Sequence, residues 1–107
     1  MTAGRLGFAT LRFMHPLIEA HRAELRALAR RRGVTAVRVF GSMSRSDGNS
    51  DSDVDLLVTL APGTSALVLG GLLLDAQELL GRRVDVATEA SLHPSLRERV
   101  MAAAVSL

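Results

Sequence analysis

The sequence predicts an α/β (α+β) domain in which helices pack on a small mixed β-sheet. Three observations support this fold class. Predicted helices alternate with predicted strands, the apolar run at 56–58 is typical of a strand buried on both faces, and 107 residues leave room for a single core. We expect one domain over residues 15–107, preceded by a mobile N-terminal arm over 1–14, where signals for regular structure are weak.

The individual elements follow from apolar periodicity and from the positions of glycine and proline. Pro16 suits the first turn of a helix that we expect to end near Arg32, because Gly33 follows it. The pair Gly70-Gly71 weakens a later helix by about 1 kcal/mol per glycine, and we expect close packing against the sheet to compensate. The predicted strands cover 34–40, 54–60 and 83–88, and the predicted helices cover 16–32, 43–46, 64–80 and 94–105.

Composition excludes several classes of protein. The chain has no cysteine, so it holds neither a disulfide framework nor a thiolate metal site, and we expect a reducing, cytoplasmic location. All 13 basic residues are arginine against 11 acidic ones, so the pI of 10.9 accompanies a net charge of only +2. We therefore do not expect direct nucleic-acid binding. Arg22, Arg26 and Arg30 form a stripe on the first helix, which is either a solvated flank or a surface for an acidic partner or nucleic acid.

We expect neither a signal peptide nor a membrane span. Arg5 and Arg12 interrupt the apolar residues of the N-terminus. The uncharged stretch 56–74 is long enough to cross a bilayer, but Pro62-Gly63 and Gly70-Gly71 break it into segments. His15 and His93 each precede a proline at a predicted helix start, where we expect them to cap the helix rather than bind a metal.

Two aspartates mark the start of the second predicted strand. Asp53 and Asp55 are two residues apart, so their side chains project from one face of the strand while Val54 points to the other. Adjacent carboxylates repel each other unless a proton or a metal ion offsets their charge. Carboxylate oxygens of this kind suit Mg²⁺, which usually takes one or two protein carboxylates together with substrate phosphates.

The segment before these aspartates has the character of a phosphate site. Gly41, at the end of the first strand, lets backbone approach a ligand closely. Ser42 is a favoured helix cap, and a short helix over 43–46 would direct free N–H groups at an anion. One stretch of chain therefore combines anion-binding backbone with cation-binding carboxylates, as a metal–nucleotide complex requires.

A third aspartate lies inside the last predicted strand. Asp85 is flanked by Val84 and Val86, and a charge within a short apolar strand must be exposed, paired or bound to a metal. If this strand lies beside 54–60, its carboxylate converges with the other two, and three carboxylates can hold two divalent cations for displacement at phosphorus. The alternative is a salt bridge from Asp85 to Arg82 or Arg83 at the strand end.

These residues together resemble a known family. Gly41-Ser42, ten intervening residues and then Asp53-Val54-Asp55 look like the signature of the DNA polymerase beta-like nucleotidyltransferases. The short length and the later VDVAT at 84–88 resemble the minimal nucleotidyltransferase (MNT) branch, and the similarity runs over about 34–97. The resemblance implies the polymerase beta-like nucleotidyltransferase core. It also implies Mg²⁺-dependent transfer of a nucleoside monophosphate from an NTP such as ATP, with two Mg²⁺ ions at the nucleotide.

The resemblance also implies roles for individual residues. Asp53, Asp55 and Asp85 match the family's metal-binding carboxylates, the last of which also helps to deprotonate the attacking hydroxyl. Gly41 and Ser42 match the turn that contacts the triphosphate, and Arg45 matches a basic residue of that loop. The sequence departs from the family pattern at Met43, where arginine is common, and at Ser46, where glycine is usual. Both departures bear on triphosphate binding.

Members of this size resemble antitoxins that adenylylate a HEPN-type ribonuclease toxin. The resemblance therefore implies such a toxin as partner, in a homo- or hetero-oligomer, with a serine or tyrosine hydroxyl as the simplest acceptor. Two alternatives remain open at this point: a non-catalytic antitoxin that masks its partner stoichiometrically, and a transferase acting on a small molecule.

Overall fold

The computed structural model describes residues 14–45 and 52–107. In chain order the helices are α2 (Pro16–Ala20), α3 (Arg22–Arg31), the 3₁₀ turn η1 (Gly41–Ser44), α4 (Val68–Leu80), the 3₁₀ turn η2 (Glu89–Ser91) and α5 (Pro94–Ala103). The strands are β1 (Val34–Phe40), β2 (Val54–Leu60), β3 (Val84–Thr88) and β4 (Val105–Ser106). The predicted arm lies outside the described residues apart from Met14, whose side chain is buried.

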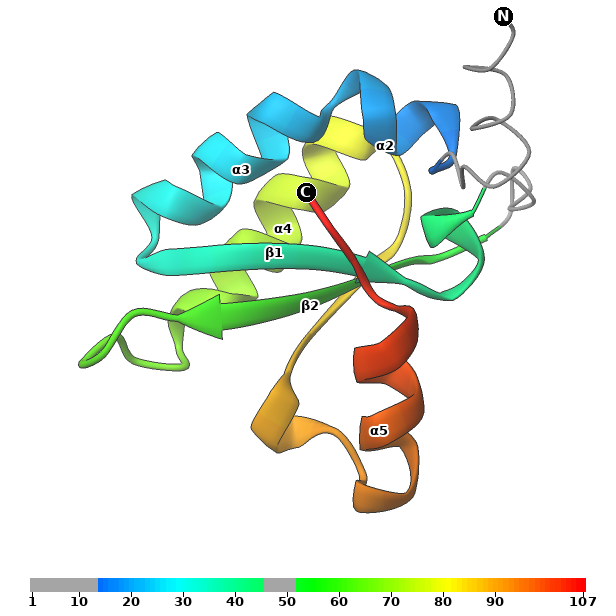
Figure 1. Ribbon diagram of the computed structural model, residues 1–107. Helices are drawn as coiled ribbons and strands as arrows, with labels where there is room; N and C mark the ends of the chain where they lie inside the picture. Colours follow the sequence, from blue (N-terminus) through cyan, green and yellow to red (C-terminus); the bar gives the residue numbers. More distant parts are fainter. Residues whose placement is uncertain (1–13, 46–51) are drawn as a thin grey trace, which may run out of the picture.

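The four strands form one mixed sheet in the order β3-β2-β1-β4 (Figure 1). β1 pairs antiparallel with β2 and with the short β4, whereas β2 and β3 run parallel. The parallel pair needs a crossover, and α4 provides it. The prediction of a small mixed sheet packed with helices is confirmed.

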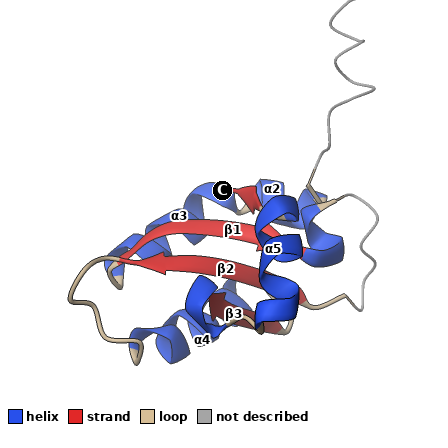
Figure 2. Cartoon of the chain, turned by 60° about the horizontal axis from the view of Figure 1, so that its bottom comes forward, coloured by secondary structure: helices blue, strands red, loops and turns tan. Residues whose placement is uncertain are grey.

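Helices α2, α3 and α4 cover one face of the sheet, and α5 lies on the other (Figures 1 and 2). The main core lies between the sheet and the first three helices, with Val39, Val54 and Leu56 from the strands among its fully buried side chains. Leu57 is also buried, at 3% exposure, although it points to the opposite face. β2 is therefore buried on both faces, as the apolar run predicted. In contrast, α5 has no buried residue.

The predicted helix over 16–32 is divided at His21. The backbone there has φ −114° and ψ 13°, and the His21 Nδ1 lies 2.9 Å from the Leu17 carbonyl oxygen. The histidine side chain thus contacts the backbone carbonyl oxygen that would accept the next hydrogen bond of a continuous helix. His15 and His93 cap their helices as predicted, because Nδ1 of each accepts a hydrogen bond at 3.1 Å from the backbone N–H two residues on.

Other boundaries also differ from prediction. α4 begins at Val68 rather than near 64, because Ser65 Oγ accepts a hydrogen bond from Leu67 N in a turn that precedes the helix. The other end of α4 agrees with the prediction, because the helix ends at Leu80 and Gly81 follows with φ +67°. α5 ends at Ala103, and the chain then adds β4 against β1, which a two-residue segment could not signal by alternation.

The two glycines in α4 do not pack against the sheet as expected. Gly70 is exposed, and a Cβ there would meet no atom within 4 Å. A Cβ at Gly71 would overlap the guanidinium of Arg32, which crosses the helix to pair with Asp75 at 2.8 Å. Gly71 therefore makes room for an ion pair between the end of α3 and α4.

The arginine stripe on α3 is divided between two environments. Arg22 folds back on its own end of the domain, with Nη2 3.5 Å from Met14 Sδ and Nε 3.8 Å from Glu19. Arg26 and Arg30 are exposed and line a hollow of about 200 Å³ beside β1 and Leu107.

Within the described part of the chain, no helix is long and apolar enough to span a membrane.

Candidate active site

The parallel pairing of β2 and β3 brings two of the three predicted carboxylates together. In this register Asp55 lies directly opposite Asp85, between the pairs Val54–Val84 and Leu56–Val86. Both valines at the first pair are buried in the helix-covered core, so Asp55 and Asp85 project from the other face of the sheet. Asp53 shares that face by strand alternation. The predicted proximity of Asp85 to Asp55 is confirmed.

Gly41 brings the end of β1 against the carboxylate of Asp55. Its φ of +75° is a left-handed conformation that favours glycine. A Cβ at this position would lie 2.7 Å from Asp55 Oδ2, closer than non-bonded atoms approach. Phe40 is the register partner of Asp55, so the antiparallel β1–β2 pairing sets this contact. The glycine thus places the turn after β1 beside the carboxylates without a side chain between them.

The three carboxylates influence one another electrostatically. Burial raises the pKa of Asp55, and the negative charges of Asp85 and Asp53 raise that pKa further. Asp55 is half-buried and Asp85 is exposed. A positive charge placed among these groups would relieve both the repulsion and the desolvation. By the type of its ligand atoms, this set of three carboxylates suits a divalent cation such as Mg²⁺.

The side chains do not close round a single point. Among residues 14–45 and 52–107, no three His, Cys, Asp or Glu side chains form a group that could hold a metal ion. Asp53 instead pairs with Arg83, whose Nε lies 3.2 Å from Asp53 Oδ1. Arg83 was considered at the sequence level as a partner for Asp85, and the structure pairs it with Asp53. Binding of a metal ion by all three carboxylates would therefore require side chains to move.

The turn after β1 is tighter than predicted. It is a 3₁₀ turn over Gly41–Ser44, not a helix over 43–46, and its cap is Phe40 rather than Ser42. Ser44 Oγ donates to the Gly41 carbonyl at 2.6 Å, and the Met43 carbonyl accepts from His15 N at 3.3 Å. The first bond closes the turn on itself, and the second ties the turn to the start of α2. Ser42 is half-buried within it, and Ser46 lies outside the described residues.

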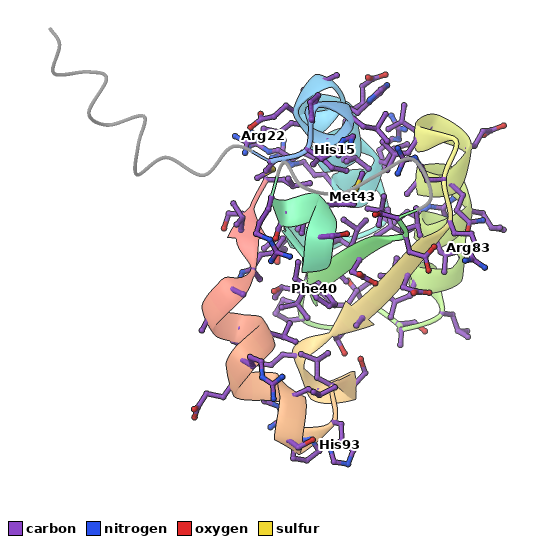
Figure 3. The ribbon with its side chains drawn as sticks, turned by 90° about the vertical axis from the view of Figure 1, so that its right-hand side faces the viewer. His15, Arg22, Phe40, Met43, Arg83 and His93 are labelled. Atoms are coloured by element: carbon purple, nitrogen blue, oxygen red, sulfur yellow. The ribbon has the colours of Figure 1, made fainter. Side chains whose placement is uncertain are left out.

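Met43, where the resemblance led us to expect arginine, is fully buried at 0% exposure. Its sulfur lies 3.9 Å from Nη1 of Arg82, and the same nitrogen donates to the Ser52 carbonyl at 3.1 Å. Arg82 therefore links the 3₁₀ turn to the residue just before Asp53. Figure 3 shows Met43 above Phe40 in the middle of the domain, and Arg83 at the start of β3 reaching outward.

Arg45, the basic residue predicted for this loop, directly follows the 3₁₀ turn and is exposed. It lines a hollow of about 340 Å³ with Ser44 and the end of α5, at Ala102 and Ala103. A larger groove of about 550 Å³ runs between α3 and α4, but it lies among the helices on the other face of the sheet and is not lined by Asp53, Asp55 or Asp85. The hollow at Arg45 is thus the one of these two that adjoins the turn.

From the sequence alone we did not predict that Arg82 contacts the turn after β1 or that Arg83 pairs with Asp53. Their position directly before the strand that carries Asp85 was the available signal. The unbroken alternation across 83–85 puts Arg83 and Asp85 on one face, and the parallel register then puts Arg83 next to Asp53. The number of residues separating the strands could not supply that register.

A mixed sheet that presents three aspartates beside a glycine turn has the architecture of a nucleotidyltransferase. The model of the family described as nucleotidyltransferase domain matches residues 19–107, so the chain belongs to this family. It is 35% identical over 96 residues to the protein adenylyltransferase MntA of Thermococcus cleftensis, which covers 90% of this chain and 94% of that protein. It is 40% identical over 75 residues to a Methanocaldococcus jannaschii protein assigned as a protein adenylyltransferase, covering 70% of this chain and 81% of that protein.

Solved structures show the same fold. A structure described as a minimal nucleotidyltransferase superposes with a TM-score of 0.75 at 42% identity, over 84% of this chain and 92% of the other. A toxin–antitoxin structure with AMP-PNP has a TM-score of 0.67 at 21% identity, over 78% of this chain and 69% of the other. The MntA-HepT toxin–antitoxin structure has a TM-score of 0.62 at 18% identity, over 82% and 69%. At these lower identities the two toxin–antitoxin structures support the fold alone.

Proposed function

We propose that this chain is a Mg²⁺-dependent protein adenylyltransferase. In this proposal it transfers AMP from ATP to a hydroxyl of a HEPN-type ribonuclease toxin and so acts as the toxin's antitoxin in the cytoplasm. The observation that supports it most is the register that sets Asp85 beside Asp55, with Gly41 against the same carboxylate. The 35% identity to a protein adenylyltransferase over nearly the whole chain supports the choice of AMP and of a protein acceptor.

Each part of the site has a separate task in this reaction. Asp53, Asp55 and Asp85 would hold Mg²⁺. When bound, the metal supplies positive charge that offsets the phosphate oxygens and the developing charge at the α-phosphorus. Gly41 keeps the approach to the carboxylates free of side-chain atoms, so backbone at Gly41 and Ser42 can contact the phosphates. Arg45, just beyond the turn, adds a guanidinium that pairs with phosphate oxygens.

The transfer itself is a displacement at phosphorus. The acceptor hydroxyl oxygen forms a bond to the α-phosphorus while the bond from that phosphorus to the oxygen bridging to the β-phosphorus breaks, and pyrophosphate leaves. Asp85 is exposed on the open face of the sheet, where it can take the hydroxyl proton from an incoming protein side chain. The domain contributes chiefly positioning and charge, as expected for phosphoryl-group chemistry.

Intact mass spectrometry of the candidate toxin tests this proposal. The toxin is incubated with the chain, Mg²⁺ and each NTP in turn, and we expect a mass increase of one or more AMP units with ATP. EDTA and the variant Asp53→Asn should each prevent the increase. An unmodified toxin after incubation with active chain and Mg-ATP would contradict the proposed activity.

A second candidate function is stoichiometric masking of the toxin without catalysis. It is favoured by α5, which has no buried residue and exposes Leu96 by 45% on the same side of the sheet as the carboxylates. A partner could cover that helix. Titration of toxin ribonuclease activity distinguishes the two functions, because a mask needs one chain per toxin and no ATP, whereas a catalyst inactivates an excess of toxin only with Mg-ATP.

A further inference from the structure

The ion pair between Asp53 and Arg83 joins a candidate metal ligand to a highly exposed cation. The side chain of Arg83 is 82% exposed and that of Asp53 is 39% exposed. Val54 N donates to the Arg83 carbonyl at 2.9 Å, which extends the β2–β3 pairing one residue beyond Val54–Val84. Arg83 therefore stands next to Asp53 as Asp85 stands next to Asp55. The guanidinium lies on the face of the sheet that carries the three carboxylates.

We infer that Arg83 is a nucleotide-binding residue that holds Asp53 while no nucleotide is present and exchanges it for the phosphates of the bound nucleotide. This inference rests on the proposed function. It assigns to one arginine two successive partners: a carboxylate in the nucleotide-free protein, and phosphate oxygens in the metal–nucleotide complex.

The first half of the exchange follows from competition for one carboxylate. Arg83 is paired with Asp53 Oδ1, so a cation drawn to the same carboxylate competes with the guanidinium for its negative charge. Exposed ion pairs are weak, since solvent screens them and ordering two side chains costs entropy. Arg83 therefore reduces the affinity for Mg²⁺ by a small factor, up to about fivefold, and leaves the carboxylate readily available.

The second half follows from the fate of the displaced guanidinium. Once Asp53 turns to the metal, Arg83 loses its partner at the place where the negative phosphates of the nucleotide arrive. Arginine binds phosphate oxygens through charge-assisted hydrogen bonds, often two at once. In the turn after β1, position 43 is a fully buried methionine. Arg83 supplies positive charge on the open face that this buried methionine does not.

The two halves predict opposite effects of one substitution. Calorimetry measures binding of Mg²⁺ alone, and then of Mg²⁺ with an ATP analogue whose α,β-bridge is methylene, so that no transfer occurs. Relative to the wild type, Arg83→Gln should bind Mg²⁺ up to about fivefold more tightly and the Mg–analogue complex about three- to tenfold more weakly. Arg83→Lys keeps the charge without the planar guanidinium, so its affinities should lie between those of the wild type and those of Arg83→Gln.

The control is Arg26→Gln on α3, which removes an exposed positive charge on the helix-covered side of the sheet and should change neither affinity. Equal Mg²⁺ affinity in Arg83→Gln and the wild type, or a change of both affinities in the same direction, would overturn the inference. If the wild type binds neither Mg²⁺ nor the Mg–analogue complex, the proposed function itself fails. Thermal unfolding of each variant verifies that the fold is retained.

Discussion

Replacing Gly41 by alanine separates the need for an open approach to Asp55 from ordinary backbone strain. Gly41 has φ +75°, and a new Cβ would lie 2.7 Å from Asp55 Oδ2. The left-handed conformation costs an alanine about 1–2 kcal/mol. For a domain of this size that lowers Tm by roughly 4–16 °C, since each kcal/mol shifts Tm by about 4–8 °C. The carboxylate must also turn away from the new methyl group.

We expect the displaced carboxylate to affect transfer far more than stability. Asp55 is a half-buried candidate metal ligand, and its position depends directly on the space at Gly41. A loss of only 1.4 kcal/mol in transition-state stabilisation lowers kcat/KM about tenfold. Gly41→Ala should therefore lose at least about tenfold in the rate of AMP transfer at a temperature where the variant is fully folded. Intact mass spectrometry of the acceptor protein at successive times measures that rate.

Gly81→Ala is the matched control. Gly81 has φ +67°, close to that of Gly41, but a Cβ there would meet no atom within 4 Å. Both variants should lose similar stability in thermal unfolding, and Gly81→Ala should transfer AMP at the wild-type rate. Equal transfer rates in the two variants would refute the reasoning, because the contact with Asp55 would then have no bearing on the chemistry.

Three further predictions concern stability. Because the pKa of Asp55 is raised in the folded protein, mainly by burial, the charged carboxylate opposes folding, and the stability present below the unfolded pKa is lost as the pH rises through the folded pKa. Without metal, Asp55→Asn should therefore be more stable than the wild type at pH 7, and the difference in urea midpoint should shrink near pH 4, where the carboxyl of the wild type becomes protonated; a constant difference would contradict this. Gly70→Ala should stabilise the protein by about 0.5–1 kcal/mol, whereas Gly71→Ala should be at least about 1 kcal/mol less stable than Gly70→Ala because it displaces Arg32, and equal Tm values would count against that packing. Met43→Ala should cost about 2–5 kcal/mol in urea unfolding since the side chain is fully buried, and a loss below about 1 kcal/mol would mean that the turn does not depend on it.

Much of the fold could be predicted because its strands have strong local patterns. The bounds of β1 and β2 match the prediction, since β-branched alternation and a two-sided apolar run are properties of each segment alone. The break at His21 could not be predicted in the same way. It depends on a histidine ring lying 2.9 Å from a carbonyl of its own helix, a choice of rotamer that apolar periodicity does not encode.

The candidate site was likewise predictable only where it depends on local sequence patterns. The shared face of Asp53 and Asp55 follows from their spacing, and the position of Asp85 follows once β3 is placed beside β2. The pairing of Arg83 with Asp53 depends on the register between two strands that a helix separates in sequence. Local signals leave such a register open by a residue or more, and a shift of one residue would have turned Arg83 to the other face.

The crossover through α4 makes the site dependent on long-range folding. β1 and β2 are neighbours in the chain, so their pairing can set Gly41 against Asp55 early, while Asp85 joins them only after α4 docks and β3 adds to the sheet. In partially folded chains in which only β1 and β2 are paired, Asp53 and Asp55 are therefore in place but Asp85 is not. Cellular activity of this protein should consequently report the completion of folding, and a chaperone or protease that captures the chain before α4 docks would meet it in an inactive form.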